Sequence, residues 1–234
     1  MFLPEMAVKI EIQQGAVHVQ QHGVDVVPVR HGGNVFVEGG VSSGYNTGMR
    51  SKPEILAAET IIRTRLFHLE RLDLRFANGT EVQYERLNTG GSGAVLVVPM
   101  LDDDTVMLIR EYAAGVHRYE LALPKGRVEP GEELLEAANR ELMEEIGYGA
   151  KQLEHLTAFS LAPGYLGHQT QVVLARGLYP QRLEGDEPEE IEVVPWSLAN
   201  LGELLARDDV TEARSIAALY MVRDLLANKD EAEP

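Results

Sequence analysis

Between residues 59 and 87, apolar and polar side chains alternate, which is the pattern of β-strands that bury one face. Residues 59–63 and 67–76 follow this alternation, and residues 81–87 resume it after Asn78-Gly79, a strong signal for a tight hairpin turn. A small antiparallel sheet is therefore predicted here. Because such a sheet has an apolar face, it needs a packing surface.

Further along, the continuous apolar run at 94–99 predicts a buried strand, and residues 106–109 predict another. The turn between them contains Asp102-Asp103-Asp104, which we interpret as a solvated hairpin loop rather than a metal site because acidic turns are common. The other predicted elements are strands at 153–161 and 171–175, the loop 162–167, and helices with N-caps Ser197 and Thr211 that run through Leu205 and Leu226.

A helix is predicted over residues 132–146, because Pro130-Gly131 signals a turn, no helix breaker follows, and Gly147 marks a stop. At about 100° per residue, one arc of this helix should face a core. That arc carries Leu134, Leu135, Ala138, Leu142 and Ile146, and the arc beside it carries Glu141, Glu144 and Glu145.

The three glutamates repel one another on a shared helix edge, and the helix dipole disfavours anions near the C-terminal end. Divalent cations bound through oxygen would relieve both penalties, and Mg²⁺ is the obvious candidate. An ordinary solvated acidic face is the alternative, and for three glutamates alone it is the favoured one.

Composition narrows the classes of function. The chain has 234 residues, 44% of them hydrophobic and 25% charged, no cysteine, and a formal net charge of −16. This composition is typical of a globular protein and fits a reducing cytoplasm. No secretion signal or membrane span is predicted, and the acidic balance argues against a nucleic-acid partner. A polyanionic substrate would require bound cations and local arginines.

Residues 1–48 differ in composition from the rest of the chain. We interpret them as an N-terminal extension of uncertain structure, with short stretches of alternating apolar and polar residues at 17–19 and 35–37. His18 and His22 have helical i, i+4 spacing, but nearby glycines and β-branched residues make a helix and a metal site there unlikely. The segment 39–44 reads as a linker. The predicted division is an extension at 1–48, an antiparallel sheet at 49–93, a larger domain at 94–228 and a charged tail at 229–234.

The spacing around the acidic helix is specific. Gly126 is followed after five residues by Glu132, and after seven more by R-E-L-M-E-E-I-G at 140–147. This resembles the Nudix box, G-x5-E-x7-R-E-U-x-E-E-x-G-U, in which U is aliphatic. The one departure is Tyr148, which replaces an aliphatic packing residue of the family.

The resemblance to Nudix hydrolases implies an α/β (α+β) fold, namely the Nudix α/β/α sandwich with a mixed sheet, here preceded by the small antiparallel sheet. It implies that Glu141, Glu144 and Glu145 bind Mg²⁺, for which Mn²⁺ can substitute, with the main-chain carbonyl of Lys125 as a further ligand. It also implies that Glu144 is catalytic. The residues implied as structural are Gly126, Glu132, Arg140 and Gly147, with Glu132 paired to Arg140.

A Nudix box identifies a reaction but not a substrate. Pro163 stands where relatives that act on ADP-ribose carry a proline, and residues 119–126 depart from the E-[LF]-P-A-G arrangement of dedicated ADP-ribose pyrophosphatases. From about Met49 to Leu226 the chain closely resembles the bacterial ADP-compounds hydrolases. This implies hydrolysis of ADP-ribose, NADH and short diadenosine polyphosphates with release of AMP. The alternatives are a dedicated ADP-ribose or other nucleotide-sugar pyrophosphatase and a non-catalytic Nudix-fold binding module.

An acidic loop follows at 184–190, and in related enzymes a glutamate of this loop acts as base or holds the metal-bound water. Glu187 and Glu189 match best by position, and the sequence does not choose between them. A solvated turn is the ordinary alternative. The substrate-contact candidates are Arg86, Arg110 and Arg118, each equally explained as a surface ion pair, and Phe67 and Tyr84, each more often a core residue.

The resemblance also implies a homodimer. In the related hydrolases the N-terminal sheet exchanges between protomers and supplies arginines to the partner's pocket. Arg63, Arg65 and Arg86 are the candidates for that role in this sequence.

Overall fold

The structure is a computed structural model that describes residues 9–13, 16–20, 29–31, 34–36, 51–88, 93–185 and 187–230. The chain divides into two compact units, Met1–Ser51 and Lys52–Pro234. The first unit contains two antiparallel hairpins, β1 (Lys9–Gln13) with β2 (Ala16–Gln20) and β3 (Val29–His31) with β4 (Asn34–Phe36). The predicted strand at 17–19 lies within β2, whereas His22 and the linker 39–44 lie outside the described residues.

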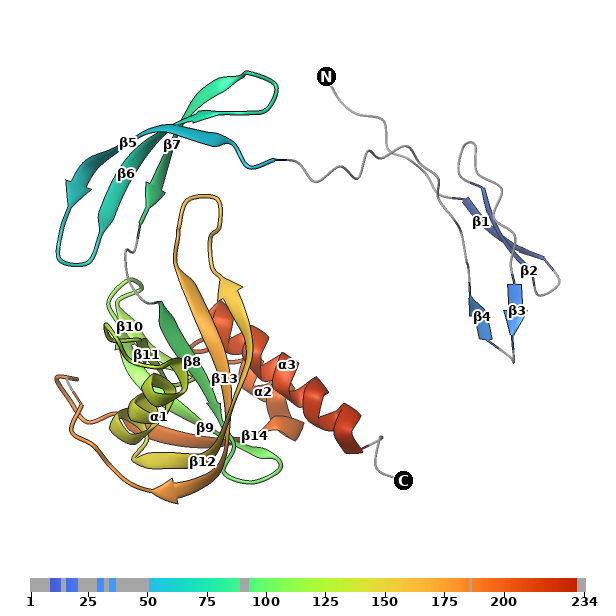
Figure 1. Cartoon of the computed structure of the whole chain (residues 1–234). Helices are drawn as coiled ribbons and strands as arrows, with labels where there is room; N and C mark the ends of the chain where they lie inside the picture. The colour runs from blue at the N-terminus through green and yellow to red at the C-terminus, as the bar shows by residue number, and fades with distance from the viewer. Residues whose placement is uncertain are drawn as a thin grey trace. The chain divides into compact units, whose positions relative to one another are not determined.

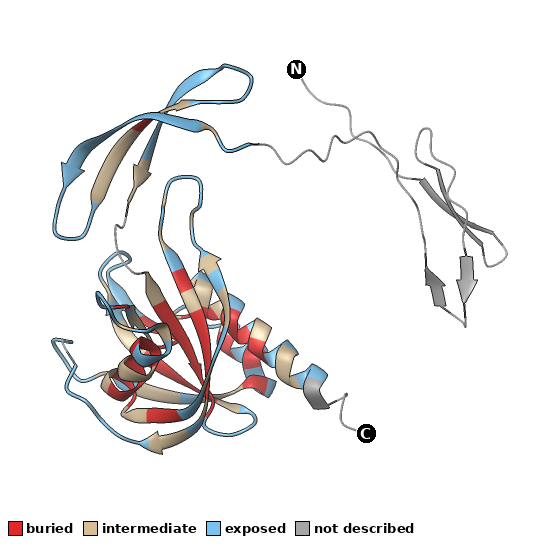
Figure 2. Cartoon of the chain, viewed as in Figure 1, coloured by how far each residue is buried: buried red, intermediate tan, exposed pale blue. Residues whose placement is uncertain are grey.

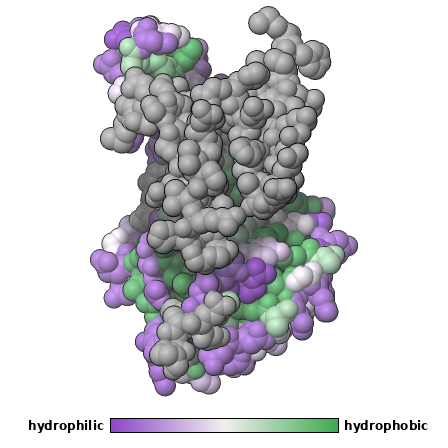
Figure 3. Space-filling view, turned by 90° about the vertical axis from the view of Figure 1, so that its right-hand side faces the viewer, coloured by the Kyte–Doolittle hydropathy of each residue, from purple (hydrophilic) through white to green (hydrophobic). Residues whose placement is uncertain are grey.

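The second unit begins with a three-stranded antiparallel sheet in the order β5-β6-β7 (Figure 1). Its strands are β5 (Glu54–Arg63), β6 (His68–Arg75) and β7 (Glu81–Leu87). Gly79 has φ of +82°, a conformation that glycine adopts without strain, so the predicted hairpin turn is confirmed. All of β5 is exposed, and Leu72 of β6 is buried. In Figure 3 the visible part of this sheet carries apolar surface beside polar surface.

The rest of the second unit is built on two further sheets. One has the order β11-β8-β13-β12, in which β13 runs parallel to β8 and the other pairs are antiparallel. The other is antiparallel with the order β10-β9-β14. Their bounds are β8 (Ala94–Pro99), β9 (Thr105–Ala113), β10 (Arg118–Ala122), β11 (Lys125–Arg127), β12 (Tyr148–Ser160), β13 (Gln169–Pro180) and β14 (Glu192–Ser197).

Helices cover both faces of the mixed sheet, as Figure 1 shows. Alternate residues of β8 point to opposite faces: Val95 and Val97 pack with α1, whereas Leu96 and Val98 pack with α2 and α3. The helices are α1 (Leu134–Glu145), the 3₁₀ turn η1 (Leu198–Asn200), α2 (Leu201–Leu205) and α3 (Ala213–Asp230). The predicted α/β/α sandwich with a mixed sheet is therefore confirmed.

Figure 2 shows the buried residues gathered on β8, β13 and the inward sides of the helices. None of the helices within the described residues combines the length and the apolar character that a membrane crossing requires. The predicted acidic turn is also confirmed, because Asp102 and Asp103 are exposed and Asp102 Oδ1 accepts the backbone N–H groups of Asp104 and Thr105.

Three details of the helices differ from prediction. Leu135 is 38% exposed, whereas Leu134 in the same turn of α1 packs against the core. Ser197 does not cap its helix, since its hydroxyl donates to Asp104 instead.

Thr211 is not the N-cap of α3 either. Its hydroxyl and backbone N–H both donate to Glu120, and the carboxylate of Glu212 accepts the N–H of Ser215 at 2.8 Å. Glu212 therefore caps the helix. The two wrong caps have the same cause, because a distant carboxylate binds the hydroxyl in each case.

Candidate active site

The C-terminal half of α1 presents its acidic edge beside the chain that follows β13. Gly147 ends the helix with φ of +76°. The backbone N–H of Gln181 donates to the Gly147 carbonyl, and that of Leu183 donates to the Met143 carbonyl, both at 3.0 Å. The segment 181–183 thus satisfies carbonyl groups at the helix end and places the acidic loop over α1.

Arg140 organises the carboxylates of the helix. Its Nε donates to Glu132 Oε1 at 2.8 Å, and its Nη1 donates to both Glu141 Oε1 and Glu144 Oε2 at 2.8 Å. Its Nη2 donates to the carbonyl of Arg127 at 2.8 Å. These partners raise the pKa of Arg140, and Arg140 in turn lowers the pKa of Glu132. The Glu132–Arg140 pair implied by the Nudix resemblance is therefore present.

Glu145 is the most buried member of the acidic edge, with 5% of its surface exposed against 8% for Glu141. Its Oε2 accepts the backbone N–H of Lys125 at 2.9 Å, and Lys125 Nζ pairs with Glu111 Oε2 at 2.6 Å. Burial raises the pKa of Glu145 to about 8, an effect opposed by Lys125 and increased by Glu141 and Glu111. A buried carboxylate in this position is unfavourable as an anion unless a cation accompanies it.

Gly126 brings the backbone of β11 against the helix. A Cβ atom added to Gly126 would lie 1.9 to 2.1 Å from the carboxylate atoms of Glu141. Only glycine permits this approach, which places the Lys125–Gly126 backbone beside Glu141 and Glu145.

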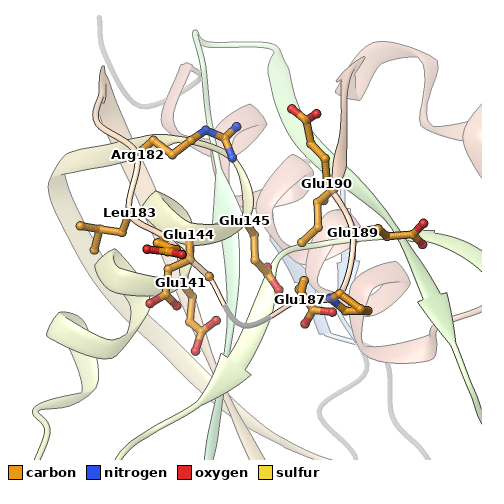
Figure 4. Close-up of a pocket in the computed structure, with 12 residues that line it drawn as sticks. Glu141, Glu144, Glu145, Arg182, Leu183, Glu187, Glu189 and Glu190 are labelled. Carbon is orange, nitrogen blue, oxygen red and sulfur yellow. The ribbon is translucent and has the colours of Figure 1, made fainter.

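A cleft of about 450 Å³ lies between the acidic edge of α1 and the loop that precedes β14. Arg182 is the one basic side chain among the described residues that line it. The lining consists of Glu141, Glu144, Glu145, Arg182, Leu183, Glu184, Gly185, Glu187, Pro188, Glu189, Glu190 and Ile191. Figure 4 shows glutamates approaching the cleft from both the helix and the loop.

The two loop glutamates predicted from the sequence, Glu187 and Glu189, extend in different directions. In Figure 4 the side chain of Glu187 lies on the side of Glu145, whereas Glu189 extends away from the three helix glutamates. Tyr119 donates its hydroxyl to Glu189 Oε1 at 2.5 Å, and this hydrogen bond raises the pKa of Tyr119.

The predicted substrate arginines do not line this cleft. Arg110 pairs with Glu192 and Asp209, and Arg118 pairs with Glu120 and donates to Thr211. These contacts match the ion-pair alternative that the sequence left open, and a role of either arginine in substrate binding stays a prediction. Arg86 likewise pairs with Glu70, and Arg63 is exposed at the end of β5.

Three further substrate-contact candidates lie outside the lining of the cleft. Pro163 is in the β12–β13 loop, which Leu87 of β7 holds through hydrogen bonds with Tyr165 and Gly167. Phe67 is 53% exposed and Tyr84 is 46% exposed, so neither is a core residue in this chain.

Arg182 was missed by the sequence analysis. A Cβ atom on Gly147 would lie 3.0 to 3.2 Å from its guanidinium group, so this cation rests over the C-terminal end of α1. No basic residue lies in the last turn of the helix itself. The available signal was an arginine two residues before the acidic loop 184–190.

The donor set fits a hard divalent cation. Within the described part of the chain, no three His, Cys, Asp or Glu side chains are already gathered as metal ligands, since Arg140 binds Glu141 and Glu144. Carboxylate oxygens and a main-chain carbonyl are nevertheless the ligand types that Mg²⁺ prefers. The buried Glu145 and the close approach at Gly126 provide such a set.

Comparison with known proteins agrees with this geometry. Residues 92–220 match the NUDIX domain, and residues 53–86 match the NudE-type Nudix hydrolase N-terminal domain. The ADP compounds hydrolase NudE of Escherichia coli strain K12 is 49% identical over 175 residues, which cover 75% of this chain and 94% of that protein. An ADP-ribose pyrophosphatase of Bacillus subtilis is 31% identical over 72% of this chain and 91% of its own length. A crystal structure of an ADP compounds hydrolase superposes with a TM-score of 0.71 and 47% identity, covering 77% of this chain and 97% of that chain.

Proposed function

Because the chain belongs to the Nudix hydrolase family, we propose that it hydrolyses the diphosphate linkage of ADP compounds in a Mg²⁺-dependent reaction that releases AMP. The likeness to an ADP compounds hydrolase carries this proposal, since it spans 94% of that protein and a NudE-type N-terminal domain accompanies it. The expected substrates are ADP-ribose, NADH and short diadenosine polyphosphates.

The cation, Mg²⁺ or Mn²⁺ in its place, would be held by Glu141, Glu144, Glu145 and the carbonyl of Lys125. When bound, it neutralises charge on the diphosphate and lowers the pKa of a water molecule. Arg140 orients Glu141 and Glu144 through its hydrogen bonds to both carboxylates. The N–H of Lys125 orients Glu145 from the other side.

A carboxylate of the cleft accepts the proton that the attacking water loses. Water attacks a phosphorus atom of the linkage, the bond from phosphorus to the bridging oxygen breaks, and the water proton passes to a carboxylate. Glu144 on the helix and Glu187 and Glu189 on the loop are the candidates. We favour Glu187 of the loop pair, because its side chain lies on the side of Glu145 whereas that of Glu189 extends away from the helix glutamates (Figure 4).

A dedicated ADP-ribose or other nucleotide-sugar pyrophosphatase is the second candidate. The 31% identity to an ADP-ribose pyrophosphatase favours it. A non-catalytic Nudix-fold module is disfavoured, because Glu132, Glu141, Glu144 and Glu145 are all retained.

We also propose a homodimer formed through the β5–β7 sheet. Ile55, Ile62 and Phe67 are 52%, 53% and 53% exposed in the single chain, and a second copy would cover such side chains. The exposed Arg63 and Arg65 would then reach the partner's cleft, together with Arg86. We expect this dimer in the cytoplasm, in keeping with a sequence that contains no cysteine.

Product analysis tests the proposed function. The purified protein is incubated with Mg²⁺ and ADP-ribose, NADH, diadenosine triphosphate or a nucleotide sugar without adenine, and the products are separated by chromatography. We expect AMP from each of the first three and little turnover of the fourth. Turnover of ADP-ribose alone would favour the second candidate, and a lack of AMP from every ADP compound would refute the proposal.

A further inference from the structure

A tyrosine on the β9–β10 hairpin holds the acidic loop from outside the cleft. Tyr112 and Tyr119 are directly opposite each other in the antiparallel pair β9–β10. Their ring centroids are 5.8 Å apart in an edge-to-face contact. Tyr112 also contacts His117 edge to face, with 5.9 Å between the ring centroids, and its hydroxyl lies 2.5 Å from His117 Nδ1. Tyr119 is therefore oriented by a paired strand and by the ring of Tyr112, which His117 contacts in turn.

The loop runs between two attachments to regular structure. At one end Leu183 is hydrogen-bonded to Met143 of α1, and at the other end Glu192 begins β14. Between these ends, Tyr119 binds Glu189 through its hydroxyl. The loop thus has a third point of attachment, on a different sheet from the one that α1 covers.

The backbone around Pro188 directs the side chains of Glu187 and Glu189 to different places. The chain bends at Pro188 and Glu189, and a proline fixes its own φ and restricts the residue before it, Glu187, to extended conformations. Glu189 is thereby directed towards the β9–β10 hairpin, while Glu187 stays beside the helix glutamates (Figure 4). The position of Glu187 depends on where Glu189 is held.

We propose that Tyr119 is a positioning residue, which anchors the acidic loop through Glu189 so that Glu187 is the loop carboxylate that serves the cleft. This inference rests on the proposed function. A surface hydrogen bond of little consequence is the ordinary alternative, since Tyr119 is 47% exposed and Glu189 is exposed as well. The two explanations differ in their predictions, because an incidental bond would affect neither loop dynamics nor turnover.

The first experiment compares Tyr119→Phe, Glu189→Ala, Glu189→Gln and the double variant Tyr119→Phe/Glu189→Ala, with ADP-ribose and Mg²⁺. Loss of the anchor should lower kcat about ten-fold with little change in KM, because small displacements of catalytic groups are costly. Glu189→Gln should recover most of the activity, since its amide oxygen still accepts the tyrosine hydroxyl. The double variant should be no worse than either single variant.

Two reference variants complete the set. Glu187→Gln should lose far more activity than Glu189→Ala. Tyr220→Phe, the same change at an exposed tyrosine on α3, should match the wild type. An unchanged kcat in Tyr119→Phe would overturn the proposal. So would a Glu189→Ala variant as inactive as Glu187→Gln, since Glu189 would then be the working carboxylate.

Hydrogen exchange separates this inference from the proposed function. Amides of residues 184–191 should exchange faster in Tyr119→Phe than in the wild type, while amides of α1 remain unchanged. This measurement needs no substrate. If the wild type hydrolysed no ADP compound, the proposed function would fail while exchange still reported on the anchor. Unchanged exchange in the loop would overturn the anchoring role itself.

Discussion

Replacement of Gly126 by alanine tests how the β11 backbone and the helix glutamates fit together. The new Cβ would lie 1.9 to 2.1 Å from the carboxylate atoms of Glu141. Atoms that are not bonded pack favourably at about 3.5–4.0 Å, so the carboxylate must retreat by more than about 1 Å. The displaced atoms are the end of a flexible side chain, and the backbone need not move.

The two consequences differ in size. Crowding of this kind destabilises a fold by about 1–3 kcal/mol, which corresponds to a lowering of Tm by roughly 2–10 °C in a chain of this size. A displacement of about 1 Å in a catalytic arrangement lowers the rate about 100-fold. Gly126→Ala should therefore remain folded and lose most of its activity.

The assay measures kcat with ADP-ribose, Mg²⁺ affinity by calorimetry, and Tm by differential scanning calorimetry. Gly202→Ala is the matched control, because a Cβ on this helical glycine meets nothing within 4 Å. It should keep full kcat and full Mg²⁺ affinity. If Gly126→Ala also kept both, the close approach of β11 to Glu141 would have no role in the metal site.

Four further predictions follow from the structure. Glu145→Gln should keep its fold and lose kcat by orders of magnitude, several kcal/mol of transition-state stabilisation, as steady-state kinetics at saturating Mg²⁺ will show. Glu145 binds its proton more tightly in the folded state, where its pKa is about 8, than in the unfolded state, so folding stability is lost as the pH rises. The Tm of the metal-free wild type should therefore fall between about pH 5 and 8 relative to the Tm of Glu145→Gln, and Mg²⁺ should restore it. Parallel plots of Tm against pH for the two proteins would refute this. A chain that begins at Met49 should keep kcat for ADP-ribose, since both family matches start beyond residue 52, and its aggregation would show that the first 48 residues belong to the core. Sedimentation over a dilution series should show a dimer whose dissociation abolishes activity, and a fully active monomer would exclude a shared cleft.

The elements and contacts that were predicted from the sequence are those determined by residues close together in the chain. The hairpin at Gly79 and the strand 94–99 follow from residue type and periodicity alone. The Glu132–Arg140 pair was implied by the resemblance to the Nudix box, whose residues lie on one loop and the helix that follows it. Strands β10 and β11 were not predicted, since β11 has three residues and exists through its pairing with β8.

The features that the sequence did not predict depend on distant partners. Arg110 is bound by Asp209, 99 residues away, and no local pattern indicates that such an arginine is engaged. Leu135 lies on the predicted apolar arc of its helix but is exposed there. Glu187 and Glu189 are equivalent in sequence, and it is the tertiary structure, including the contact of Glu189 with Tyr119, that distinguishes them.

The charge of the cleft links these observations to catalysis. Seven glutamates and one arginine are among its described lining residues, in a chain whose formal net charge is −16. A diphosphate would be repelled by such a surface unless cations were bound first. The arginines that could have opposed this repulsion, Arg110 and Arg118, are committed to acidic partners elsewhere. Positive charge must therefore come from the divalent cation, from Arg182, or from a second copy of the chain. This requirement explains why metal binding, and not a basic pocket, should govern the affinity for substrate.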